Sequence, residues 1–589
     1  MSVHPNDVAR RSRMARIGLA LIFAWLGGSF FKAQVVEHDR YKLQSQENRL
    51  RSIPLPAPRG IIYDRKGAII AENLPGYSVS LLAPNIDSLR SALRQLSTAV
   101  TLNPDQIEAA VRRFKRDRNR PTVIIADASI DVISVLEEHR LNFPGLIIQS
   151  VPKRFYPDGA AVASFIGFTG EITDADLNNT QYQGYKPGQL IGKAGIEKQY
   201  EKQLRGKEGV RYDEVDARGR VLTRTTPRPD LNPEPAPPLY TNIDIDLQKY
   251  AATVFGDSLQ GGVIAIDPRD GGVLALYSAP TFDPNRFTGG IPIDYWKSLL
   301  GDERHPLVNK VVQGTYPPGS TFKLATAVTG LQLGVVDLDS HMPVPCNGGY
   351  QYGSRYFRCW EKRGHGDISL AQAIKVSCDT YFYQLGLKIG LSKLIAGGVS
   401  LQLRDRSGID LPEEKRALFP ASVDYYNKRW GPRGWSNAET LNLAIGQGAN
   451  AQTLVNMAKF YTALAMDGSA VRPEIVRGAA SREQIFKLSP EQMDGLRSAL
   501  AGVVSAGGTA ASSRIEGVVL AGKTGTAQNG TTKGDHAWFV GFAPAEKPEI
   551  VVAVMLEFGG HGTRAARIAS AIISHYLKVQ PVSSVETEG

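Results

Sequence analysis

Hydrophobic and polar positions follow different patterns in different parts of the chain. Near the N-terminus an apolar run covers residues 17–31, and its extension to residue 36 adds only Lys32 and Gln34 as strongly polar side chains. That extension gives the ~20 residues that a membrane-spanning helix needs. Residues 87–99 and 105–118 have the spacing of amphipathic helices, and Asp87 is the expected N-cap of the first.

After residue 240 the pattern changes to short apolar strands separated by glycine-rich turns. Residues 262–268 and 271–276 predict a two-stranded hairpin, and residues 320–334 and 370–389 have helical patterns. Further strands at 517–521, 537–542 and 550–557 precede a closing helix at 565–577. Helices between strands that are far apart in the sequence indicate a layered α+β domain.

A proline-rich segment marks the predicted domain boundary. Residues 227–238 contain six prolines, a density typical of an extended connector rather than a packed element. The predicted division is a cytoplasmic tail (1–16), a transmembrane anchor (17–36), a first domain (37–226), a connector (227–239), a second domain (240–580) and a tail (581–589).

Charge near the N-terminus predicts the orientation of the anchor. Four arginines precede the apolar run: Arg10, Arg11, Arg13 and Arg16. Positive charge on that side favours a cytoplasmic N-terminus and an exported body. A cleaved signal peptide is the alternative. An uncleaved anchor is favoured, because Phe30, Phe31 and Lys32 stand where a small-x-small cleavage pattern would be needed.

Composition narrows the class of protein further. The 589 residues are 42% hydrophobic and 21% charged, which predicts folded domains with sizeable cores. The net charge of +10 would suit an anionic partner. No run of lysine and arginine interleaved with aromatic residues follows the N-terminal segment, so no nucleic-acid partner is expected.

The first chemical motif is Ser320-Thr321-Phe322-Lys323, which follows two prolines and a glycine. Proline and glycine before a serine predict a helix start, and residues three apart share a helical face. Lys323 is then placed to activate Ser320 as a nucleophile. A surface helix that contains this short pattern by chance is the alternative, and for this motif alone it would be preferred.

Two further motifs follow in the same domain. The second is Ser377-Cys378-Asp379, and the third is Lys523-Thr524-Gly525-Thr526 on a predicted strand. A lysine beside two hydroxyls can bind a substrate carboxylate, and a glycine in such a strand suits the close approach of a ligand backbone. Serine penicillin-binding proteins and class A β-lactamases carry motifs of this kind in this order. The three together are a much stronger signal than any one of them.

Together with other landmarks, these motifs resemble those of the class B penicillin-binding proteins over about residues 59–577. The landmarks are Arg59-Gly60, Arg154-x-Tyr156-Pro157, Gly192-x-x-Gly195-Ile196-Glu197, Gly446-Gln447-Gly448 and Trp538-Phe539-Val540-Gly541. The resemblance implies a multidomain α+β protein with an extended, mostly β pedestal and a transpeptidase domain whose antiparallel sheet is flanked by helices. No segment resembles a glycosyltransferase domain, so a monofunctional enzyme is expected.

The resemblance also implies a reaction. A peptidoglycan stem that ends in D-Ala-D-Ala is the expected donor, Ser320 the nucleophile and Lys323 its base, with no cofactor for catalysis. Ser377 is expected to relay a proton to the leaving D-Ala, and backbone N–H groups of Ser320 and Thr526 to form the oxyanion hole. The expected carboxylate-binding set is Lys523, Thr524, Gly525 and Thr526. β-Lactams would acylate the same serine.

Three alternatives share these motifs: a β-lactamase, a β-lactam receptor and a division-type class B protein. Neither of the first two needs a large pedestal and a single N-terminal anchor. Against the third, Asp379 stands where most of the family has asparagine, and that form resembles the elongation subgroup. Membership of that subgroup implies lateral wall synthesis and a membrane partner, a glycosyltransferase of the SEDS type such as RodA, with other elongation-complex proteins.

The three cysteines of the chain fall close together, and a histidine lies between the last two: Cys346, Cys359, His365 and Cys378. One interpretation is a disulfide between Cys346 and Cys359 with Cys378 free, which an oxidising compartment permits. The other is a structural zinc site of the Cys₃His type. The zinc interpretation is favoured, because a similar region in some elongation-type relatives carries zinc.

Overall fold

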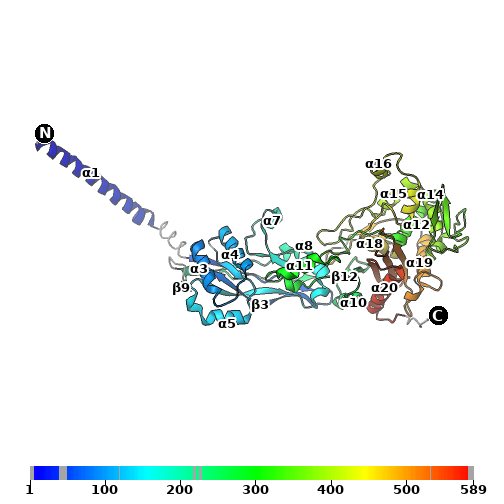
Figure 1. The fold of residues 1–589 in the computed structure, drawn as a ribbon, viewed down its shortest axis with the longest axis horizontal. Helices are drawn as coiled ribbons and strands as arrows, with labels where there is room; N and C mark the ends of the chain where they lie inside the picture. The colour runs from blue at the N-terminus through cyan, green and yellow to red at the C-terminus, as the bar shows by residue number, and fades with distance from the viewer. Residues whose placement is uncertain are drawn as a thin grey trace.

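The protein is an elongated molecule with a single helix projecting from one end (Figure 1). Helix α1 (Pro5–Phe31) continues as a π-helical turn, Lys32–Val36. Among the described residues it is the one helix long and apolar enough to cross a membrane, over Ser12–Val36. The computed structural model describes residues 5–38, 50–118, 120–215, 221–223, 229–479, 481–530 and 532–581.

Long antiparallel strands form the middle of the molecule, the pedestal. Strand β3 (Ile69–Leu81) pairs with β5 (Leu146–Phe155) along nearly its whole length. Helices α3 (Ile86–Leu96), α4 (Pro104–Arg116) and α5 (Ile130–Glu138) cover its end nearest α1 (Figure 1). Their apolar faces share one core with the strands, so this end of the pedestal is stabilised by burial of apolar surface.

The N-cap of α3 is Asn85, and the prediction of Asp87 was wrong. The side chain of Asn85 accepts a hydrogen bond from the backbone N–H of Ser88 at 2.9 Å. Asp87 instead lies in the first turn, where a carboxylate interacts favourably with the positive end of the helix dipole. Both residues suit a helix start, and the sequence pattern alone does not separate them.

The proline-rich segment is bound to the pedestal over its described part. Backbone bridges join Glu234 to Lys207 and Leu231 to Val210, beside strand β8 (Gly209–Val215). Strand β10 (Leu239–Tyr240) then pairs in parallel with β2 (Ile62–Tyr63). Chain segments on both sides of the predicted boundary are therefore hydrogen-bonded to one another. Residues 227 and 228 of the predicted connector lie outside the described residues, as do residues 1–4 of the predicted N-terminal tail and residues 582–589 of the C-terminal one.

The far end of the molecule is an antiparallel five-stranded sheet flanked by helices, the α+β domain that was expected. Helix α20 (Gly562–Leu577) and helix α10 (Ile245–Phe255) pack against the sheet and each other. Helix α18 (Leu454–Ala465) packs against strands β11 (Gly261–Ile266) and β19 (Ile550–Leu556). Every residue of the three inner strands, β11, β19 and β18 (His536–Ala543), is buried. The order of the strands is β12 (Val273–Ala279), β11 (Gly261–Ile266), β19 (Ile550–Leu556), β18 (His536–Ala543) and β17 (Ala521–Ala527).

Two predicted helices differ from what the pattern indicated. The segment 370–389 forms two helices, α13 (Leu370–Lys375) and α14 (Asp379–Ile389), which are separated at Ser377 by a positive φ of 56°. The segment 320–334 begins as a 3₁₀ turn, η6 (Gly319–Phe322), and continues as α12 (Lys323–Gln332). Both departures fall at predicted catalytic motifs.

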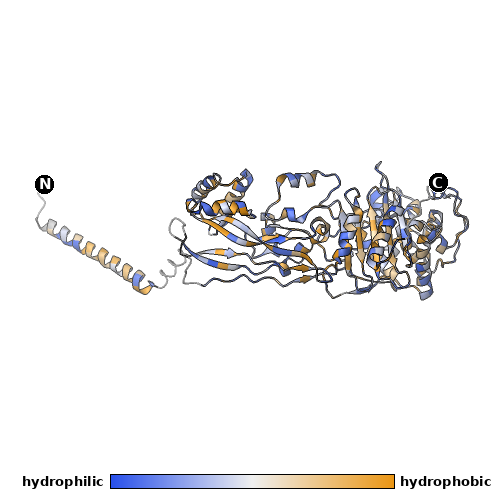
Figure 2. Ribbon diagram, turned by 90° about the horizontal axis from the view of Figure 1, so that it is seen from below, coloured by the Kyte–Doolittle hydropathy of each residue, from blue (hydrophilic) through white to orange (hydrophobic). Residues whose placement is uncertain are grey.

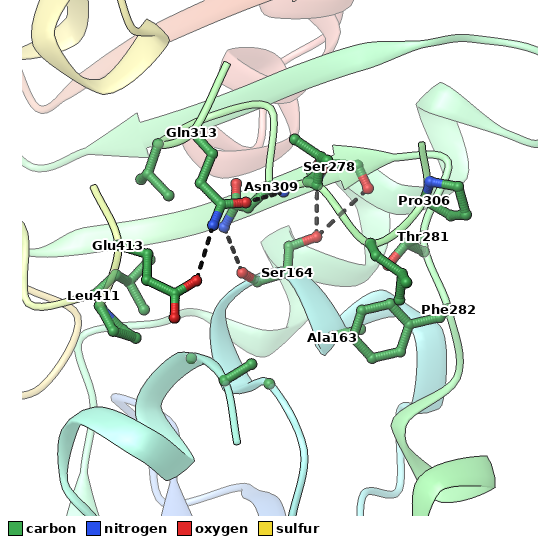
Figure 3. A pocket seen from close by; sticks show the side chains of 17 residues that line it. Ala163, Ser164, Ser278, Thr281, Phe282, Pro306, Asn309, Gln313, Leu411 and Glu413 are labelled. Carbon is green, nitrogen blue, oxygen red and sulfur yellow. Dashed lines mark hydrogen bonds between the residues drawn. The ribbon is translucent and has the colours of Figure 1, made fainter. Parts of the chain in front are cut away.

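The pedestal and the sheet domain are joined by a polar junction and a continuous apolar core. Figure 3 shows Ser164, on helix α6 (Ala163–Ile166), between two residues of the sheet domain. Its hydroxyl accepts a hydrogen bond from the N–H of Ser278 at 2.9 Å, and its carbonyl accepts one from Asn309 Nδ2 at 2.6 Å. The cavity beside them measures about 100 Å³. Apolar residues of both domains pack in one cluster, and apolar stretches run through both in Figure 2.

Candidate active site

Ser320 lies on a turn that is held against the edge of the sheet. Gly319, the residue before it, has a φ of +52°, and a Cβ there would lie 2.7 Å from the carbonyl oxygen of Thr526 on β17. Only glycine accommodates both the backbone angle and this close approach. Ser320 is partly exposed in a cleft of about 1070 Å³.

Lys323 joins the first motif to the second. Its side chain is fully buried, and its Nζ donates to Ser377 O at 2.9 Å, to Ser377 Oγ at 3.2 Å and to Asp379 Oδ1 at 2.7 Å. An ammonium group has three N–H donors, so these contacts satisfy all of them. The break between α13 and α14 makes this arrangement possible, because it presents both the hydroxyl and the carbonyl of Ser377 to Lys323.

Asp379 accepts hydrogen bonds from both Lys323 and Trp360, and the sequence motifs did not reveal Trp360. Its Oδ2 accepts a hydrogen bond from the backbone N–H of Trp360 at 3.1 Å. The indole N–H of Trp360 donates to the carbonyls of Val376 and Ser377, each at 3.1 Å. The only sequence signal for Trp360 is its position directly after Cys359, one of the predicted metal ligands.

Lys523 is the buried lysine of the third motif. Its Nζ donates to the carbonyl oxygen of Thr524 at 3.1 Å, and no described carboxylate lies within ion-pair distance of it. Burial and the charge of nearby Lys323 hold the pKa of Lys523 well below its ordinary value. In this site, therefore, Lys323 is the lysine that has a carboxylate partner, and Lys523 is the one whose charge is disfavoured.

The rest of the third motif lies on β17, at the edge of the sheet. Thr526 is exposed in the cleft, and its hydroxyl accepts a hydrogen bond from Gly562 N at 3.4 Å. The hydroxyl of Thr524 is 2.7 Å from that of Thr509, a second residue that the motifs did not reveal. A Cβ at Gly525 would lie 2.8 Å from the carbonyl oxygen of Pro318. The absence of a side chain at Gly525 therefore lets strand β17 lie close to the backbone of the serine turn.

All predicted catalytic and substrate-binding residues therefore meet around one cleft. Lys323 and Lys523 lie buried beneath it, and the Gly525 backbone lies behind the serine turn. Residues that line the cleft directly include Ser320, Ser377, Asp379, Thr524 and Thr526. A serine at a helix start, beside a buried lysine and below an edge strand, defines a serine acyltransferase site of the penicillin-binding class.

The cysteine cluster adjoins this site and has the donors of a zinc centre. The ligand atoms of Cys346, Cys359, His365 and Cys378 all lie within 4.8 Å of one another, and all three thiols are free. His365 Nδ1 is 3.6 Å from the sulfurs of both Cys346 and Cys359. In a tetrahedral zinc site, sulfur and nitrogen ligands are about 3.6 Å apart, as follows from the usual metal–ligand lengths.

The cysteines of the cluster differ in how readily they ionise. The contact with the Cys378 thiol lowers the pKa of Cys359 to about 2, and the same contact together with burial raises the pKa of Cys378. Thiolates are the form in which cysteine binds metal. The alternative interpretation, a disulfide between Cys346 and Cys359, is not what the structure shows, since both thiols are free. The donor set therefore fits zinc.

Comparison with known proteins identifies the family. The model of the penicillin-binding protein transpeptidase domain matches residues 261–574, and that of the penicillin-binding protein dimerisation domain matches residues 54–235. Peptidoglycan D,D-transpeptidase MrdA of Acinetobacter baumannii is 34% identical over 97% of this chain and 89% of that protein. The chain belongs to the MrdA (PBP2) family of class B penicillin-binding proteins, the elongation-type peptidoglycan D,D-transpeptidases.

Solved structures agree with this assignment. A complex of PBP2 and MreC from Helicobacter pylori contains a chain with a TM-score of 0.78 and 27% identity, matched over 90% of this chain and 99% of that one. A chain from a peptidoglycan synthase complex has a TM-score of 0.71 and 28% identity, over 98% of this chain and 100% of that one. The reaction of the protein is thus D,D-transpeptidation, which links stem peptides through an acyl-enzyme.

Proposed function

We propose that Ser320 is the nucleophile of this transpeptidase and that the three motifs act as one site. The observation that carries this proposal is the convergence of Ser320, Ser377 and Thr526 on one cleft, with Lys323 bonded beneath it. Ser320 attacks the penultimate carbonyl of a D-Ala-D-Ala stem, and its proton passes to the Lys323–Ser377 pair. Backbone N–H groups of Ser320 and Thr526 stabilise the oxyanion.

The proton relay requires Lys323 to release a proton first. In the structure its three donors are engaged, one of them by Ser377 Oγ at 3.2 Å. A base must offer a free lone pair, so one N–H proton of Lys323 passes to the carboxylate of Asp379 before Ser320 is activated. Asp379 is the acceptor closest to Lys323, at 2.7 Å, and it positions that lysine throughout. The leaving D-Ala then takes its proton through Ser377.

The third motif binds the terminal carboxylate of the donor. Thr524 and Thr526 offer hydroxyls at the cleft, and Lys523 lies directly behind them. A substrate carboxylate would favour the charged form of Lys523, which burial otherwise disfavours. β-Lactams carry a carboxylate in the equivalent place, so they acylate Ser320 by the same route and are released slowly.

Labelling with a fluorescent penicillin tests the nucleophile. Ser320→Ala should abolish the covalent label while the protein keeps its thermal unfolding temperature. Ser505→Ala is the matched control, because Ser505 is an exposed serine that lies outside the cleft. A label that survives Ser320→Ala would contradict the assignment.

Zinc in the cysteine cluster is a separate proposal. Cys346, Cys359, His365 and Cys378 would hold the ion, which would brace the start of α14 without entering the reaction. Metal analysis of protein purified without added zinc should find about one zinc per chain, and Cys359→Ser should lower that value. A zinc content near zero, with three titratable thiols, would contradict the proposal.

The membrane orientation and the partners are also proposals. Arginines in the first part of α1, ahead of its apolar run, favour a cytoplasmic N-terminus, a periplasmic catalytic domain and a single pass through the bacterial inner membrane. The pedestal carries a cavity of about 550 Å³, and the similar Helicobacter pylori protein is solved with MreC. We infer that elongation-complex proteins, including an MreC-type protein and a SEDS glycosyltransferase such as RodA, bind through pedestal and anchor. Leu190→Glu, at the rim of that cavity, should weaken binding of the MreC-type protein, and unchanged binding would contradict this.

A further inference from the structure

A tyrosine four residues before Ser320 is fixed to the sheet domain by hydrogen bonds that the proposed reaction does not use. The hydroxyl of Tyr316 donates to Glu557 Oε1 at 2.7 Å. Its backbone forms an antiparallel bridge with Gln452, with N–H to carbonyl distances of 2.9 and 2.8 Å. The residues that line the cleft do not include Tyr316, Gln452 or Glu557. Any effect of Tyr316 on the reaction therefore passes through the chain that joins it to Ser320.

The acceptor of this hydrogen bond belongs to the centre of the sheet. Glu557 directly follows the buried strand β19, and its backbone N–H donates to the carbonyl of Gln260 at 2.8 Å. Burial and the charge of Glu557 raise the pKa of Tyr316, so its hydroxyl keeps its proton and remains the donor. Hydrogen bonds to a carboxylate are shorter and stronger than those between neutral groups. Tyr316 is therefore tied firmly to an inner strand.

The ring of Tyr316 is held as well as its hydroxyl. It packs against the ring of His536, at the start of β18, with centroids 5.3 Å apart and an angle of 78° between the planes. His536 is buried, and its Nδ1 accepts a hydrogen bond from the N–H of Phe558 at 3.3 Å. A Cβ at Gly314 would lie 2.4 Å from the Tyr316 ring, so the chain also folds closely around it. These contacts leave the side chain one orientation.

The segment between Tyr316 and Ser320 is stiff. Residues 317 and 318 are both prolines, whose rings fix φ near −65°. The observed φ of Pro318 is −78°. Gly319, which alone lacks such a restraint, is packed against the carbonyl of Thr526. A displacement of Tyr316 is therefore passed on to Ser320 rather than absorbed between them.

The other side of Ser320 is fixed independently. Tyr461 on α18 is fully buried, and its hydroxyl donates to the carbonyl of Thr321 at 2.9 Å. With this side held, the place of Ser320 depends on the tether at Tyr316. Attack requires the reacting atoms to lie about 3–3.5 Å apart, and a misplacement of about 1 Å can lower a rate about 100-fold.

We propose that Tyr316 and Glu557 are positioning residues for the transpeptidase reaction, which together hold Ser320 in place for attack on the donor carbonyl. The inference rests on the proposed role of Ser320 as the nucleophile. Neither side chain touches the substrate. Their contact therefore governs the rate of acylation, whereas binding of the donor carboxylate depends on β17.

Acylation kinetics of the full-length protein with benzylpenicillin separate these two quantities. The concentration dependence of the rate gives the dissociation constant of the non-covalent complex and the first-order rate constant of acylation. Tyr316→Phe keeps the ring and removes the hydroxyl. It should lower the rate constant about 10-fold and change the dissociation constant less than about twofold. Counting active sites with fluorescent penicillin expresses the rate per folded molecule.

Variants of the acceptor test whether the two residues act as a pair. Glu557→Gln keeps an oxygen that can accept from Tyr316, so its rate constant should stay within about threefold of that of the unmodified protein. Glu557→Ala should be as slow as Tyr316→Phe. The double variant Tyr316→Phe/Glu557→Ala should be little slower than either, because each substitution removes the same contact.

Tyr200→Phe is the matched control, because the hydroxyl of Tyr200 also donates to a carboxylate, Asp410 Oδ2 at 2.8 Å, and neither residue lines the cleft. This variant should keep its rate constant of acylation. An unchanged rate constant in Tyr316→Phe, an equal fall in Tyr200→Phe, or additive losses in the double variant would overturn the inference. Absence of the penicillin label from Ser320 in the unmodified protein would instead count against the nucleophile itself.

Discussion

Lys523 shows how burial sets the charge of a single residue in this site. Its pKa lies well below the ordinary value because of burial and the nearby charge of Lys323. Between that lowered pKa and the unfolded value of about 10.4, the folded lysine is neutral while the unfolded one binds a proton. The unfolded state then holds more protons, so the free energy of unfolding should rise with pH in this window, by up to about 1.4 kcal/mol per pH unit.

Urea unfolding at pH 7.5 and pH 9.0 measures this effect. Lys523→Met should show a smaller rise between the two pH values than the unmodified protein, because it lacks the titrating group. Equal changes in the two proteins would show that Lys523 is charged in the fold.

Thr509 is predicted to position the hydroxyl of Thr524. The two oxygens are 2.7 Å apart, and Thr509→Val removes one partner while it keeps the shape of the side chain. Loss of one such hydrogen bond costs about 0.5–1.5 kcal/mol. The second-order rate constant of acylation by penicillin should therefore fall about 2- to 10-fold. Thr253→Val, on the exposed face of α10, is the control, and an equal effect there would point to a general loss of stability.

At the residue scale, the sequence predicted every motif residue but not the residues outside the motifs that contact them. Ser320, Lys323 and Lys523 could be predicted as site residues because short motifs keep fixed spacings on one helix or strand. Trp360 and Thr509 were missed because they reach the site from separate loops, and no local pattern records a contact between distant segments. Asp87 was misassigned for a local reason, since Asn85 competes for the same cap.

At the element scale, the break between α13 and α14 is what the hydrophobic pattern could not show. Apolar residues on both sides keep helical spacing, so the pattern predicts one helix. The structure instead places Ser377 at positive φ, where its hydroxyl and carbonyl both meet Lys323. A non-glycine residue at positive φ is unfavourable by itself, and here the bonds made by Ser377 and Trp360 hold it in place.

The buried ion pairs around Glu197 lead to a prediction for the stability of the pedestal. Glu197 on helix α8 (Gly195–Gln199) is fully buried between Arg59, at 2.7 Å, and Arg154, at 2.6 Å. Glu197→Ala would leave both guanidinium groups without this partner, and breaking such a pair typically costs about 3–5 kcal/mol.

Thermal unfolding should thus show a large loss for Glu197→Ala. The control is Glu137→Ala, because Glu137 forms an exposed pair with Arg140 that is worth well under about 1 kcal/mol. Similar unfolding temperatures for the two variants would mean that the cluster contributes little to the pedestal.

At the scale of the whole molecule, the order of anchor, pedestal and catalytic domain followed from the sequence, but their connection did not. Proline density suggested an extended connector rather than a packed element, whereas residues 231 and 234 are bridged to the pedestal and β10 joins its sheet. The contacts of Ser164 with Ser278 and Asn309 add a second joint. Such pairings depend on segments far apart in the chain, and local patterns do not encode them.

Removal of the anchor tests the independence of the catalytic domain from the membrane. Helix α1 is exposed along its length and contributes nothing to either core. A chain that begins at residue 50 should therefore leave the membrane fraction and keep its rate of acylation by penicillin. A severalfold loss of that rate in a folded, soluble protein would show that the anchor shapes the active site.

The central claim is that Ser320 forms the acyl-enzyme, and peptide mapping after treatment with penicillin tests it most directly. Mass spectrometry of the digested protein should find one penicilloyl adduct, on the peptide that contains Ser320, with fragment ions that place it on that residue. The adduct should persist after the free drug is removed. An adduct on another residue, or unmodified protein together with steady hydrolysis of the drug, would contradict the account.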